Sequence, residues 1–103
     1  SMRYKIDASV LGGNKSEKNS RCRLKVSVHD LGLHIMGIIV QDSIIEGEKY
    51  YITTPAHNVG AKFYKDVTFE TSNELWLQIQ AACIKAVSGH EKASADPLER
   101  LWK

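Results

Sequence analysis

The sequence of 103 residues predicts one α+β domain, an antiparallel meander sheet of four to five strands packed by one main helix, plus a short C-terminal helix. Two stretches near the N-terminus alternate apolar and polar residues, which is the period of a half-buried strand. A later stretch repeats apolar residues at helical spacing. The chain is 43% hydrophobic and 25% charged, a globular composition with room for a single core.

The strands are predicted from these alternations and from the turns between them. Residues 3–10 and 21–28 form the first two strands, joined as a hairpin by the polar, glycine-rich stretch 12–20. A turn at 29–32 leads to an apolar strand over 33–42. The remaining expectations are a strand over 49–54 that Pro55 ends, a loop over 57–61 and a short strand over 63–69.

The main helix is predicted between residues 71 and 89. Thr71 or Ser72 is the expected cap, with Glu74 completing a capping box, and Gly89 is the expected stop. A second, short helix is predicted to open at Asp96-Pro97. The domain boundaries that follow are residues 1–89 for the α+β domain and residues 90–103 for a linker and the short helix.

The third strand is apolar on both of its faces, which predicts a homodimer. One helix covers only one face of a strand, so the other face needs a partner subunit. Strict alternation puts Leu33, Ile35 and Ile39 on one face and Met36, Ile38 and Val40 on the other. The predicted dimer interface is Leu33, Ile35, Met36, Ile38, Ile39 and Val40.

Charge is segregated along the chain. Residues 1–25 carry seven basic and two acidic side chains, a formal charge of +5, which leaves −3 for the rest of a chain whose net charge is +2. Such segregation creates a local electrostatic field even when the total charge is small.

The N-terminal cations are predicted to share one face of the sheet. With apolar residues facing the core, the two N-terminal strands turn five cations to the opposite face, and two more lie on the connecting loop. The candidate phosphate-binding residues are Arg3, Lys5, Arg21, Arg23 and Lys25 on the strands, with Lys15 and Lys18 on the loop. The alternative is a solvated face that keeps the sheet from pairing edge to edge.

Two stretches resemble the SpoVG family of small bacterial regulatory proteins. The first is GIIVQDSIIEGEKYYITTPA over 37–56, and the second is KDVTFETSNELWLQIQAA over 65–82, with Asp66 and Glu74 at matching positions. The resemblance extends from about Arg3 to Val87. It implies a dimeric α+β protein that binds DNA or RNA and regulates without catalysis. A cytoplasmic location is expected from the two cysteines, which are predicted to be reduced, and from an N-terminus that does not resemble a signal peptide. Neither a cofactor nor a small-molecule substrate is expected.

Other functions have weaker support in the sequence. Four histidines (His29, His34, His57 and His90) lack the spacing of a zinc site, so no metal is expected. Cys22 and Cys83 lie in apolar surroundings typical of inert, buried thiols in a reducing compartment, and no catalytic residue is expected. No stretch is apolar over the roughly 20 residues that a membrane span needs. A small protein–protein interaction module is the alternative to nucleic-acid binding, and an enzyme comes third.

Overall fold

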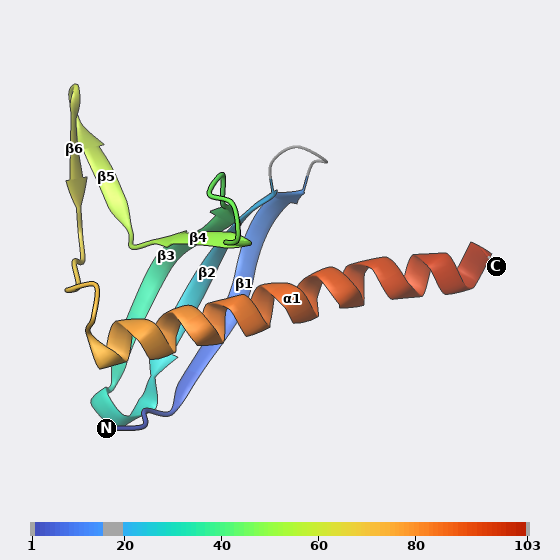
Figure 1. Cartoon of the computed structure of the whole chain (residues 1–103), viewed down its shortest axis with the longest axis horizontal. Helices are drawn as coiled ribbons and strands as arrows, with labels where there is room; N and C mark the ends of the chain where they lie inside the picture. Colours follow the sequence, from blue (N-terminus) through green and yellow to red (C-terminus); the bar gives the residue numbers. More distant parts are fainter. Residues whose placement is uncertain (1, 16–19, 103) are drawn as a thin grey trace.

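The computed structural model describes residues 2–15 and 20–102, and the side chains of residues 2–13 and 21–89. Figure 1 shows a four-stranded antiparallel sheet with one long helix across one face, and a two-stranded hairpin that stands off from the sheet. The fold is therefore α+β, as the sequence predicted. The elements are β1 (Ile6–Lys15), β2 (Ser20–Val28), the short 3₁₀ helix η1 (His29–Leu31), β3 (Leu33–Asp42), β4 (Tyr50–Thr53), β5 (Ala56–Val59), β6 (Lys62–Lys65) and α1 (Glu74–Trp102).

The sheet is a meander in which each strand pairs with its neighbour in sequence, in the order β1-β2-β3-β4. Val10 of β1 lies opposite Leu24 of β2, so the two alternating stretches form the predicted hairpin. Successive side chains of a strand point to opposite faces. The apolar set therefore lies beneath α1, where Leu24, Val26 and Val28 are fully buried. No described helix lies on the opposite side of the sheet, which we call the outer face.

Asn73 caps the start of α1. Its side-chain oxygen accepts the backbone N–H of Trp76 at 3.0 Å, which satisfies one of the free donors of the first turn. The predicted cap at Thr71 or Ser72 is therefore wrong by one or two residues. From this start, the buried stripe of α1 carries Ile79, Cys83 and Val87 into the core.

The helix continues through Gly89 to Trp102 as one element of 29 residues. The predicted stop at Gly89 is not used, because one glycine inside a helix costs only about 1 kcal/mol relative to alanine. A separate short C-terminal helix is not confirmed, and the division at residue 89 stays a prediction. In Figure 1 the C-terminal part of α1 extends beyond β1.

Gly37 forms a β-bulge that changes which residues of β3 face the core. Leu24 pairs with Ile38 and Lys25 pairs with Met36, so Gly37 is the extra residue, and its φ of +90° favours glycine. The strict alternation expected for β3 is therefore wrong. Leu33, Ile35, Ile38 and Val40 lie on the helix side, while Met36 and Ile39 lie on the outer face.

The hairpin formed by β5 and β6, which we call the hairpin arm, replaces the predicted loop over 57–61. Gly60, with a φ of +62°, makes the turn between the two short strands. Pro55 closes the base of the arm, since its carbonyl oxygen accepts the N–H of Asp66 at 2.8 Å. The arm pairs with no other described strand. Its projection helps explain a radius of gyration of 15.2 Å, compared with about 13 Å for a compact domain of 100 residues.

Within the part of the chain that the structure describes, no helix combines the length and apolar character that a membrane crossing requires.

Candidate nucleic-acid interface

The outer face carries a row of three cations on β2, Arg21, Arg23 and Lys25, which we call the basic row. These residues alternate with the buried Cys22 and Leu24, so their side chains share the face that α1 leaves uncovered. Alternate residues of a strand lie about 7 Å apart. The strand thus presents regularly spaced positive charges, which is what contact with successive phosphates needs.

The charges of the basic row have no acidic partner among the described side chains. Ion pairs in that part of the chain join His29 to Asp7 and His57 to Asp66. Unpaired cations that stay hydrated keep their full charge for a ligand. The basic row therefore differs from a salt-bridged face whose charges are already neutralised.

Arg23 extends from β2 to the bulge at Gly37 in β3. A Cβ atom on Gly37 would lie 3.5 Å from Arg23 Nε, 3.7 Å from its Nη2 and 3.9 Å from Pro55 Cβ. The guanidinium of Arg23 therefore lies against the bulge, in the space that a side chain at residue 37 would enter.

The other four predicted cations lie outside β2. Arg3 precedes β1 and lines a hollow with Gln78, Ala81 and Ala82 of α1, so the structure places it beside the helix. Lys5 lies just before β1, and its backbone N–H donates to a carboxylate oxygen of Asp30 at 2.6 Å. Lys15 is the last residue of β1, with its side chain outside the described part, and Lys18 lies outside the described residues. Of the five cations expected on one face, three lie in a line on β2 and Arg3 lies beside α1, whereas the place of Lys5 on the outer face stays a prediction.

His29 of η1 and His34 of β3 each pair with a nearby polar side chain. His29 Nε2 lies 2.5 Å from a carboxylate oxygen of Asp7, and His34 Nδ1 lies 2.8 Å from Ser27 Oγ. Across the described side chains, no three His, Cys, Asp or Glu residues come together as ligands for a metal ion. The side chain of His90 lies outside the described part.

Aromatic rings lie near the basic row. Tyr51 of β4 is 49% exposed and pairs with Gln41, which in turn pairs with Arg21. Phe63 of the hairpin arm is 66% exposed. From the sequence, Phe63 was predicted to begin a short strand, and no functional role was expected for it. Its exposure follows from the separation of the arm from the sheet, which no local pattern indicates.

A cleft of about 390 Å³ lies between the outer face and the base of the hairpin arm. Met36, Gly37 and Ile39 of β3 border it on one side, and Pro55, Ala56 and Phe63 border it on the other. Arg21 and Arg23 line it as well, together with Thr53, Thr54 and Asp66. The structure therefore joins two members of the basic row to an exposed aromatic ring.

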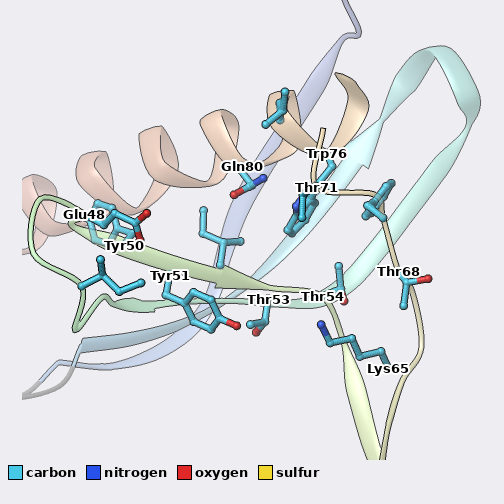
Figure 2. Close-up of a pocket in the computed structure, with 14 residues that line it drawn as sticks. Glu48, Tyr50, Tyr51, Thr53, Thr54, Lys65, Thr68, Thr71, Trp76 and Gln80 are labelled. Carbon is cyan, nitrogen blue, oxygen red and sulfur yellow. The ribbon is translucent and has the colours of Figure 1, made fainter. Parts of the chain in front are cut away.

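A larger hollow of about 560 Å³ lies on the helix side of β4 (Figure 2). Trp76 and Gln80 of α1 border it, and Trp76 stacks on Phe69 with ring centroids 5.1 Å apart. Tyr50 also borders the hollow, and its buried hydroxyl group has no hydrogen-bond partner among the described residues. In the same view Tyr51 and Thr53 point away from α1, and Lys65 reaches from β6 toward β4.

The two thiols are buried and not joined by a disulfide. Burial raises the pKa of the Cys83 thiol to about 12, because desolvation disfavours the thiolate. A thiol that stays protonated is a poor nucleophile.

Comparisons with models of protein families, with curated proteins and with solved structures found no match to this chain.

Proposed function

We propose that this protein binds nucleic acid through the phosphate backbone, using Arg21, Arg23 and Lys25 of the outer face. The observation that carries the proposal is the basic row itself: three cations at strand spacing, on an uncovered sheet face, with no ion pair to a described residue. Phosphate contacts from Lys and Arg supply most of the affinity of sequence-independent binding.

The resemblance to the SpoVG family points in the same direction, because it implies a dimeric bacterial regulator that binds DNA or RNA. We propose binding without catalysis and without a cofactor. The burial that raises the pKa of the Cys83 thiol to about 12 argues against this cysteine as a nucleophile.

The proposal is tested by fluorescence anisotropy with labelled oligonucleotides at low salt. The variant Arg21→Glu/Arg23→Glu/Lys25→Glu reverses the basic row and is expected to abolish binding. The matched control Lys49→Glu/Lys62→Glu/Lys85→Glu reverses three exposed lysines outside the row and changes the net charge equally. It is expected to retain most of the affinity. Absence of binding by the unmodified chain at low salt, or equal losses in the two variants, would refute the proposal.

A homodimer is the second proposal, and the edge of β3 favours it. β4 pairs only with Ile39–Asp42, so the edge of β3 before Ile39 has no partner among the described strands. An open strand edge is a template for pairing with another chain. Of the predicted interface residues, Leu33 and Met36 are exposed and Ile39 is half-buried, whereas Ile35, Ile38 and Val40 belong to the core of one chain.

Light scattering coupled to size-exclusion chromatography tests the dimer. At micromolar concentration we expect twice the mass of one chain, and a monomer mass would contradict the proposal. Pairing along this edge leaves the outer face open, so dimer formation and nucleic-acid binding are compatible.

A further inference from the structure

We propose that the cleft between the outer face and the hairpin arm holds one unpaired base of a single-stranded nucleic acid, stacked on Phe63. This inference rests on the proposed function and specifies its substrate: a single strand in preference to a duplex.

The size and composition of the cleft suit a flat, partly apolar group next to an anion. Its volume of about 390 Å³ lies within the range of about 300–1,000 Å³ typical of small-molecule sites. Met36 and Ile39 give it an apolar border, while Arg21 and Arg23 bring two positive charges. A nucleotide has this combination, an apolar ring face joined to a phosphate.

Arg23 links the two parts of the proposed site. Its guanidinium lies against Gly37, and Arg23 lines the cleft together with Pro55, so it belongs both to the basic row and to the cleft. A phosphate bound by Arg23 would thus hold its own base next to the apolar border of the cleft. Asp66 also lines the cleft, and its carboxylate is engaged by His57 Nδ1. The two arginines outnumber this single acidic group.

Phe63 is the ring available for stacking. The neighbouring Tyr64 lies on the opposite face of the arm, since adjacent strand residues point to opposite faces, and it stacks on His57 with ring centroids 5.9 Å apart. Among the described residues Phe63 stacks on no other ring. Phe63 is 66% exposed and lines the cleft beside two arginines that form no ion pair with a described residue. Single-strand-binding surfaces combine aromatic platforms with a basic groove in the same way.

A duplex does not satisfy this arrangement. Its bases are stacked and paired inside the helix, and extruding one costs a few kcal/mol. A single strand can turn a base toward a side-chain ring without breaking a pair. The basic row alone would accept both forms, so the preference for a single strand depends on the cleft.

The test compares a labelled oligothymidylate of about 12 nucleotides, within the range of about 4–16 that single-strand-binding domains cover, with the same strand annealed to its complement. At equal salt we expect tighter binding of the single strand. Phe63→Ala should weaken that binding by about 5- to 150-fold and leave duplex binding almost unchanged. Tyr64→Ala, which also removes an aromatic ring one residue away, is the matched control and should have little effect on the affinity for the single strand. Phe63→Tyr should retain binding, whereas Phe63→Leu, which keeps apolar bulk without a ring, should not.

The outcomes separate this inference from the proposed function. If single strand and duplex bind equally, or if Phe63→Ala binds normally while reversal of the basic row abolishes binding, the cleft inference is wrong and the proposed function stands. If no nucleic acid binds at low salt, both are wrong. If Phe63→Ala converts a dimer to a monomer while Phe63→Leu binds nucleic acid normally, a second copy of the chain occupies the cleft and the inference is overturned.

Discussion

The number of phosphate contacts made by the basic row can be read from the salt dependence of binding. Each cation that engages a phosphate of a single strand contributes about −0.7 to the slope of log K against log salt concentration. Arg21, Arg23 and Lys25 together give a slope of about −2.1, which corresponds to an approximately 20-fold loss of affinity between 50 and 200 mM salt. Three phosphate contacts by the basic row therefore predict this slope for the unmodified protein.

Neutralising one cation should remove one contact. In Arg23→Gln the slope should fall in magnitude to about −1.4, which reduces the loss over the same salt range to about 7-fold. Arg3→Gln is the matched control, because Arg3 lies beside α1 and its loss should leave the slope unchanged. The assay is fluorescence anisotropy with a labelled single strand over a series of NaCl concentrations. Equal slopes for Arg23→Gln and the unmodified protein, or an equal change in Arg3→Gln, would refute the assignment of the contacts.

Two further predictions concern the body of the fold. Gly13→Ala should destabilise it by about 1–3 kcal/mol, because the new Cβ would lie 2.9 Å from Cys22 Sγ and 3.1 Å from the carbonyl oxygen of Arg21. Gly12→Ala, with nothing within 4 Å of its Cβ, should change stability by less than about 0.5 kcal/mol, and similar urea midpoints for the two variants would contradict this difference. Cys83 should make stability fall with increasing pH, since its pKa is raised from 9.0 to about 12 in the folded chain and the unfolded chain therefore loses the proton first. Melting temperatures measured between pH 8 and pH 11 should fall less steeply in Cys83→Ala, and parallel curves would count against the buried, protonated thiol.

The parts of the fold that follow from local periodicity were predicted well. Alternation along residues 3–10 and 21–28 is sufficient to place Leu24 in the core and Arg23 on the outer face, since a strand with one buried face has a strongly specified register. The helical stripe through Ile79 and Cys83 was predicted for the same reason. In the two strands and in the helix, one constant spacing of apolar residues holds over many residues.

The errors arose where one residue changes the geometry. The bulge at Gly37 reverses the faces of β3 after Met36, and a glycine in an apolar strand does not by itself reveal a bulge. Gly60 closes a hairpin that pairs His57 with Tyr64, whereas His57 was expected in a loop.

The candidate site was predicted in part, because its two components come from distant segments. The basic row depends on the alternation of β2, which the sequence shows directly. The cleft depends on the direction in which the chain leaves β4 at Pro55, and it is this direction that brings Phe63 close to Arg21 and Arg23. No pattern within residues 56–66 indicates that proximity.

The central claim, that the basic row of the outer face binds nucleic acid, is tested most directly by following the backbone amide NMR signals during titration with an oligothymidylate. We expect the signals of Arg21, Arg23 and Lys25 to shift, with smaller changes across Met36 and Ile39, while the exposed side of α1 stays unchanged. Shifts that cluster on α1 and leave β2 unaffected would contradict the account.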